Sequence, residues 1–237
     1  MSAGRVRIPH RQPTKATPLT FVLSALAAGS LAVSSGTAAV AASPDATEHP
    51  DALVVTPSQL EGPFYPVELP VDRDADLTLV DGADGPAAGE PLLLAGQLLT
   101  ADGEPVEGAV IEIWQTDDGG VYLHPQDPGI AARDAAFQGY GESVTDEAGA
   151  WSFRTILPEI YGGRPRHIHA KVKIAGETAL TTQIYFSGGD IPAEGTVPIT
   201  DEVTDALTVE AFADLDADGE AVLRASHLIV IPVPAGT

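Results

Sequence analysis

The apolar positions of this chain fall in short runs that are separated by turn residues. Runs rich in β-favouring residues occur at residues 92–99, 109–115, 151–156, 167–174, 180–186 and 221–231. Turn sequences lie beside these runs, namely Asp102-Gly103, Glu147-Ala148-Gly149, Ser187-Gly188-Gly189-Asp190 and Asp218-Gly219. No segment shows a long apolar repeat with the helical period of 3.6 residues. The pattern predicts an all-β fold, a single β-sandwich domain with long functional loops.

The first 55 residues follow a different pattern. Residues 1–20 have no acidic side chain and four basic ones, Arg5, Arg7, Arg11 and Lys15. An apolar run at 21–33 and small residues at 38–42 follow, which is the order of a cleavable secretory signal peptide. The apolar run is too short for a comfortable permanent anchor, although an uncleaved anchor or a disordered tail remains an alternative. We expect a signal peptide at 1–42, a polar linker at 43–55, a folded domain at 56–237, and export to the cell envelope or the medium.

Composition narrows the possible partners. The 237 residues are 44% hydrophobic, which is enough for the core of one domain. The formal net charge is −22, and it becomes −26 without the four positive charges of the expected signal peptide. Such a charge disfavours nucleic acid and anionic membranes as partners. The chain has no cysteine, which excludes disulfides, a thiol nucleophile and a cysteine-based zinc site.

The candidate chemistry lies in two tyrosines and two histidines. His167 and His169 are two residues apart, so a β-strand would point both rings to the same face. Tyr161 lies six residues before His167, across a Gly-Gly turn, and Tyr122 follows another Gly-Gly pair. Two phenols and two imidazoles are therefore candidates to reach one metal ion.

The order of several motifs resembles that of the intradiol ring-cleavage dioxygenases, the protocatechuate- and catechol-cleaving enzymes with non-haem iron(III). The motifs are Thr56-Pro57-Ser58-Gln59-Leu60-Glu61-Gly62-Pro63-Phe64-Tyr65-Pro66, Ile113-Trp114-Gln115, Gly119-Gly120-Val121-Tyr122, Arg164-Pro165-Arg166-His167-Ile168-His169 and Thr182-Gln183-Ile184-Tyr185-Phe186. They cover most of the chain beyond residue 55. The resemblance implies a β-sandwich with one Fe(III) per chain. It also implies that O2 opens a small catechol-type substrate to a cis,cis-muconate-type diacid.

The resemblance also assigns the metal ligands. Tyr122 and His167 would lie with a hydroxide in the equatorial plane of the iron, and Tyr161 and His169 would be axial. Phenolates are hard anionic ligands and favour the ferric state, while imidazoles complete the set without adding charge. The released phenolate of Tyr161 would also accept a substrate proton.

Further site residues follow from the same resemblance. Arg164 would stabilise the negative charge that develops during the reaction, and Gln183 would help to position the reacting atoms. Gly62, Pro63 and Phe64 match a loop that borders the substrate pocket, or else form the first turn of the domain. We expect Trp114 and Gln115 to belong to the scaffold.

The sequence leaves four other matters open. From the sequence we expect no helical N-terminal domain like that of catechol and hydroxyquinol members, so the chain resembles the shorter protocatechuate branch; Arg133 and Arg166 are then candidate clamps for a substrate carboxylate, or else exposed side chains. Oligomer formation is possible. Residues 214–219 imitate the start of a calcium loop, but the twelfth position is Ala225, so a hairpin turn is favoured. His124, close to Tyr122 in the sequence, either supports that ligand from behind or is an exposed loop histidine, and we expect the exposed one.

Two alternative functions compete with ring cleavage. The first is a non-catalytic β-sandwich module or partner subunit of the same fold, which is expected to have lost at least one ligand. The second is a hydrolytic zinc site with one phenolate, against which the second tyrosine and the missing carboxylate argue.

Overall fold

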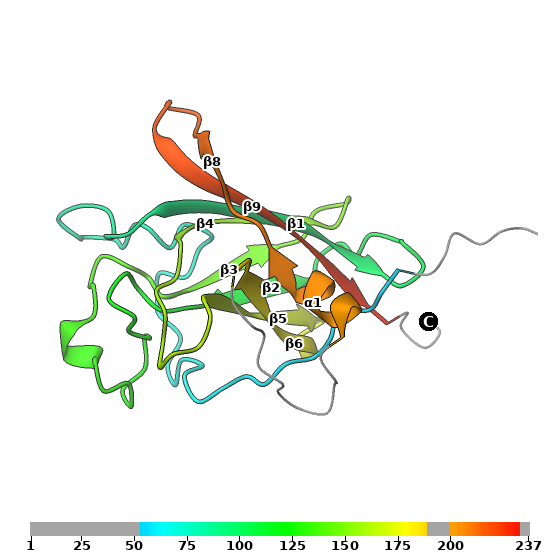
Figure 1. The fold of residues 1–237 in the computed structure, drawn as a ribbon, viewed down its shortest axis with the longest axis horizontal. Helices are drawn as coiled ribbons and strands as arrows, with labels where there is room; N and C mark the ends of the chain where they lie inside the picture. Colours follow the sequence, from blue (N-terminus) through cyan, green and yellow to red (C-terminus); the bar gives the residue numbers. More distant parts are fainter. Residues whose placement is uncertain (1–52, 189–199, 233–237) are drawn as a thin grey trace, which may run out of the picture. The chain divides into compact units, whose positions relative to one another are not determined.

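The computed structural model describes residues 53–188 and 200–232, which form two stacked β-sheets (Figure 1). The first sheet has the strand order β4-β1-β9-β8, with β1 at Pro91–Thr100, β4 at Ala150–Ile156, β8 at Phe212–Leu215 and β9 at Ala221–Ile231. The second has the order β3-β2-β5-β6-β7, with β2 at Val110–Trp114, β3 at Tyr140–Val144, β5 at His167–Ile174, β6 at Glu177–Phe186 and β7 at Thr208–Val209. The helical elements are the 3-10 helix Ile130–Ala132 and the helix α1, Asp201–Leu207. The all-β sandwich is confirmed.

The core lies between the two sheets and is built by alternation along the strands. On β4, Trp151 and Phe153 are buried whereas Ser152 between them is exposed. On β5, Ile168 and Ala170 belong to the apolar cluster that fills the interior. The histidines that alternate with them therefore point to the opposite face of the second sheet.

All six strands that the sequence predicts are present, and five elements of the described chain were missed: β3, β7, β8, α1 and the 3-10 helix at Ile130–Ala132. β3 contains a glycine and two polar residues, β7 is only two residues long, and all four residues of β8 are exposed, so none of them shows a clear apolar alternation. The missed helix α1 is short and begins after Thr200, whose side chain accepts a hydrogen bond from the Val203 amide. These elements depend on neighbours or caps rather than on an apolar period.

The calcium-like segment is a hairpin turn between β8 and β9, as expected. The Asp216 amide donates to the Glu220 carbonyl at 2.9 Å, and the Asp216 carboxylate accepts from the amides of Asp218 and Glu220. The carboxylate therefore serves the turn itself.

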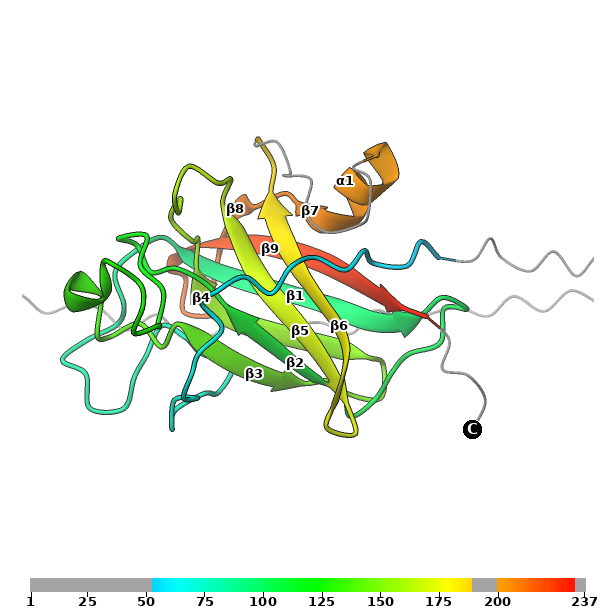
Figure 2. The same ribbon diagram turned by 90° about the horizontal axis from the view of Figure 1, so that it is seen from below.

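The N-terminal segment of the described chain crosses the outer face of the second sheet (Figure 2). The backbone amide of Gln59 donates to the Thr181 carbonyl at 2.9 Å, and the Thr182 hydroxyl donates to the Pro57 carbonyl at 2.8 Å. This crossing brings residues after Leu60 to the face that carries the two histidines.

The expected signal peptide, residues 1–42, and most of the expected linker lie outside the described residues. The Leu53 amide already donates to the Ala101 carbonyl at 2.9 Å. No helix within residues 53–188 and 200–232 is long and apolar enough to cross a membrane.

Candidate metal centre

The structure brings the four candidate ligands together from one strand and two loops. The Tyr122 hydroxyl oxygen lies 3.0 Å from His167 Nε2. The Tyr122 ring centroid is 5.3 Å from that of Tyr161 and 5.9 Å from that of His169, and the two imidazole centroids are 4.9 Å apart. Tyr122, His167 and His169 are buried, whereas Tyr161 is partly exposed. Three of the candidate ligands are thus enclosed, and the fourth is partly accessible to solvent.

The turn before Tyr122 is held by carboxylates. Asp117 Oδ1 accepts from the amides of Gly119 and Val121, and the Tyr122 amide donates to Asp127 Oδ2 at 2.9 Å. Gly120 has φ +76°, and a Cβ atom there would lie 3.0 Å from the Ile160 carbonyl oxygen. Only glycine therefore fits where the loop before Tyr122 meets the loop before Tyr161.

Hydrogen bonding orients His167. Its Nδ1 lies 2.8 Å from the Pro165 carbonyl oxygen, which can only accept, so Nδ1 carries the proton. The lone pair of Nε2 is therefore left on the side of the Tyr122 hydroxyl. This is the tautomer that a metal ligand needs.

The ring of His169 is oriented by stacking. The Trp114 ring lies parallel to it, with centroids 4.8 Å apart and an interplanar angle of 12°. His169 Nδ1 is buried and has no hydrogen-bond partner within the described part of the chain, which is costly for a polar atom. Trp114 therefore does more than support the scaffold, contrary to the expectation from sequence. Gln115 is scaffold as expected, since its amide donates to the Ile156 carbonyl.

The electrostatics of the four ligands suit a cation. Burial lowers the pKa of His167 to about 4 and that of His169 well below its usual value, so both imidazoles are neutral at pH 7. Burial raises the pKa of both Tyr122 and Tyr161, so without a cation both phenols keep their protons. A bound cation would displace these protons and leave two phenolates with two neutral imidazoles. Among the described residues no three His, Asp or Glu side chains gather, so any metal centre here depends on the tyrosines.

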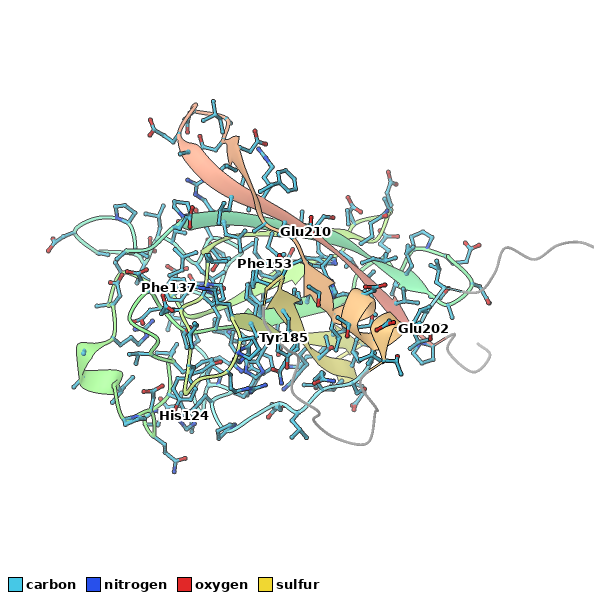
Figure 3. The ribbon with its side chains drawn as sticks, in the orientation of Figure 1. His124, Phe137, Phe153, Tyr185, Glu202 and Glu210 are labelled. Carbon is cyan, nitrogen blue, oxygen red and sulfur yellow. The ribbon has the colours of Figure 1, made fainter. Side chains whose placement is uncertain are left out.

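Arg164 and Gln183 also meet beside the ligands. Arg164 Nη2 donates to Gln183 Oε1 at 2.9 Å and to the Tyr185 hydroxyl at 3.2 Å, and that hydroxyl donates to Gln183 Oε1 at 2.9 Å. Tyr185, labelled in Figure 3, is buried on β6, and the strand register pairs it with His167 on β5. Sequence reasoning did not assign Tyr185 to the site, although its spacing of two from Gln183 on one strand was a usable signal.

The Gly62-Pro63-Phe64 turn lies against the ligands. Gly62 has φ +73°, and a Cβ atom there would be 3.3 Å from His169 Cε1. The Phe64 ring stacks on Tyr122 at 5.1 Å and meets the edge of Tyr161 at 5.2 Å. The loop therefore borders the candidate ligands, and its role as a wall of the substrate pocket stays a prediction.

Other expectations about nearby residues need correction. His124 is buried, not exposed; its Nδ1 accepts from the Gln126 amide, and its ring lies 5.5 Å from that of Phe64. The candidate carboxylate clamps are engaged elsewhere. Arg166 donates to the Pro158 carbonyl and to Glu159, while Arg133 donates to the Phe137 carbonyl.

Comparison with known proteins supports the resemblance to the dioxygenases. Residues 60–165 match the family model described as dioxygenase, a stretch that includes both tyrosines and Arg164 and ends before the histidines. The chain is 34% identical over 141 residues to the protocatechuate 3,4-dioxygenase beta chain of Burkholderia cepacia, covering 55% of this chain and 59% of the relative. It is 34% identical over 151 residues to catechol 1,2-dioxygenase of Acinetobacter baylyi, covering 56% and 47%. The chain spans about half the length of these curated relatives.

Solved structures share the fold. The dioxygenase domain of a dioxygenase and carbohydrate-binding fusion from Streptomyces sp. SirexAA-E matches with a TM-score of 0.56 and 27% identity, covering 76% of this chain and 99% of that domain. Catechol 1,2-dioxygenase from Acinetobacter sp. ADP1 also matches with a TM-score of 0.56 and 27% identity, covering 75% and 62%. These matches confirm the resemblance to the intradiol ring-cleavage dioxygenases.

Proposed function

We propose that this chain, which shares its fold and its motifs with the intradiol dioxygenases, is itself a ring-cleaving dioxygenase. It would use O2 to open a catechol-type ring between the two hydroxyl-bearing carbons and give a cis,cis-muconate-type diacid. The observation that carries the proposal is the convergence of Tyr122, Tyr161, His167 and His169 in one cluster, in which all but Tyr161 are buried.

The four residues fit a ferric ion. Tyr122, Tyr161, His167 and His169 would hold one Fe(III), because two phenolates favour the trivalent state and two neutral imidazoles complete the set. When bound, the ion would act as a Lewis acid for the two catechol oxygens and make the electron-rich ring reactive towards O2.

Tyr161 suits the role of a base that moves. Its side chain is partly exposed, unlike that of Tyr122, and it is followed by Gly162 and Gly163, which have φ values of +59° and +81°. As a phenolate it would take a proton from one substrate hydroxyl as the substrate binds. Tyr122 is fixed by burial and by the hydrogen bond that its backbone amide donates to Asp127 Oδ2, so it would remain a ligand throughout.

Arg164 suits the role of a preorganised charge stabiliser. Its guanidinium is fixed by Gln183 and Tyr185, so little reorganisation is needed as negative charge develops on the opening ring. Gln183 also donates from Nε2 to the Leu60 carbonyl at 2.8 Å. Gln183 therefore orients both the arginine and the segment that leads to the Phe64 wall.

The alternatives are weaker on the same observations. A non-catalytic module of this fold is expected to lack a ligand, and all four residues are present and adjacent. A hydrolytic zinc site is disfavoured by the second phenol and by the lack of a carboxylate among the four clustered side chains.

Metal analysis, absorption spectroscopy and oxygen uptake test the proposal together. The purified protein should carry about one iron per chain and absorb visible light through tyrosinate-to-iron charge transfer. It should also consume O2 with ring opening across a panel of catechols that includes catechol, hydroxyquinol and protocatechuate. Colourless, zinc-loaded protein with no uptake on any member of the panel would overturn the assignment.

A further inference from the structure

Lys171 is a buried cation on the same face of β5 as the two histidines. It follows His169 by two residues, and its side chain is 7% exposed. Its Nζ lies 2.7 Å from Glu61 Oε2 and 3.6 Å from the centre of the Tyr65 ring. None of the roles derived above for the reaction uses this lysine.

Both contacts of Lys171 are with one loop. Glu61 and Tyr65 stand immediately before and after the Gly62-Pro63-Phe64 turn that lies on His169 and Tyr122. We propose that Lys171 is a positioning residue that clamps the Glu61–Tyr65 loop against the metal ligands and so fixes the Phe64 wall of the substrate pocket. The consequence for catalysis rests on the proposed function, whereas the clamp itself does not.

The contacts along the segment explain why a clamp is needed. Before the loop, the segment is tied to β6 through the Gln59 amide and the Leu60 carbonyl. Glu61, Gly62 and Pro63 are exposed, and the positive φ of Gly62 turns the chain sharply. The buried ammonium of Lys171 contacts the residues at both ends of this turn, Glu61 and Tyr65, and so limits the movement of the turn.

Lys171 is also connected to His169 through two packed aromatic rings, those of Tyr65 and Trp114. The Tyr65 ring meets the Trp114 ring edge-on, with centroids 5.0 Å apart, and Trp114 stacks on His169. Lys171 Nζ lies 5.5 Å from the Trp114 ring as well. On its far side, Tyr65 donates its hydroxyl to the buried carboxylate of Glu112, which is paired with Lys173.

The chemistry of each contact predicts which substitutions matter. An ammonium over an aromatic face in a desolvated place is a strong cation–π contact, whereas the ion pair is weakened because the Glu61 side chain is 45% exposed. Lys171→Met removes both contacts and keeps the apolar stem. Lys171→Arg keeps the charge, and Glu61→Gln removes the ion pair alone.

Steady-state kinetics of the iron-loaded protein test the effect on substrate. Lys171→Met should raise KM for catechol roughly tenfold and change kcat less than threefold, because the loop shapes the pocket but supplies no reacting group. Glu61→Gln should raise KM by about threefold, because only the ion pair is lost. Lys171→Arg keeps the charge, so its KM should lie much nearer to that of the wild type than to that of Lys171→Met. The matched control is Arg154→Met, which breaks a carboxylate pair between β4 and Asp216 in the β8–β9 turn, away from the loop, and its KM should stay within about twofold of wild type. An unchanged KM in both Lys171→Met and Glu61→Gln, or an equal rise in Arg154→Met, would overturn the positioning role.

Amide hydrogen exchange of the metal-free protein tests the clamp without any activity. Peptides that span residues 59–66 should exchange at least about tenfold faster in Lys171→Met and measurably faster in Glu61→Gln, with no change in Arg154→Met. Unchanged exchange in the first two variants would refute the clamp even if the enzyme is active. A wild-type protein that cleaves no catechol would instead refute the proposed function and leave the exchange result valid. Should Lys171→Met fail to fold, Glu61→Gln and Lys171→Arg decide the question.

Discussion

His227 on β9 should make the stability of this protein depend on pH. Its side chain is 4% exposed, and Nε2 has no hydrogen-bond partner among the described residues. Desolvation lowers its pKa from 6.5 to about 4. The unfolded chain therefore binds this proton more tightly than the folded chain, and the stabilisation is complete above pH 6.5 and lost as the pH falls towards 4.

The size of the effect follows from the pKa difference. A difference of about 2.5 units at about 1.4 kcal/mol per unit corresponds to about 3 kcal/mol in the free energy of unfolding. By linkage, about 2 kcal/mol of it should be lost between pH 7 and pH 5. This is a large part of the 5–15 kcal/mol that is typical of whole domains.

Urea unfolding of the metal-free wild type and of His227→Leu at pH 7 and pH 5 measures the effect. Leucine has an apolar side chain of similar size that cannot bind a proton. The carboxylates and the other histidines are common to both proteins, so their contributions cancel in the comparison. The wild type should lose about 2 kcal/mol more than the variant on going from pH 7 to pH 5. The reasoning is refuted if both proteins lose the same free energy of unfolding.

Three further predictions concern the site and the leader. Tyr122→Phe should lose tight iron binding and turnover together, and full iron with full turnover in this variant would contradict the ligand set. Tyr161→Phe should retain part of the iron, with an altered visible spectrum and slower anaerobic binding of catechol. Arg164→Ala should keep iron content and most of the colour but lower turnover by roughly a hundredfold. The neighbouring Arg166→Ala, whose guanidinium binds Pro158 and Glu159, should change turnover little, and equal losses in the two variants would argue against a specific role for Arg164. We also propose that the protein is exported after cleavage near Ala42, so N-terminal sequencing of protein from its native host should start at Ala42 or Ser43 and not at Met1.

The fold class and the four candidate ligands could be predicted from the sequence. Strands such as β4 and β5 were predictable because alternation of apolar and polar residues is a local property that a pleated strand converts directly into two faces. The spacing of His167 and His169 belongs to the same class of information. The Gly-Gly turns before Tyr122 and after Tyr161 were also visible, because glycine marks backbone that other residues cannot adopt.

Only the tertiary structure decided how these residues act on one another. The 3.0 Å approach of Tyr122 to His167 joins residues 45 positions apart. The burial of His124, the place of Tyr185 beside Arg164 and the stacking of Trp114 on His169 likewise depend on which loops and strands become neighbours. Lys171 reads in the sequence as a polar residue on a half-exposed strand, and it becomes a clamp only because the Glu61–Tyr65 loop crosses above it. Local pattern fixes the face on which a side chain lies, but its partner is set by the packing of distant segments.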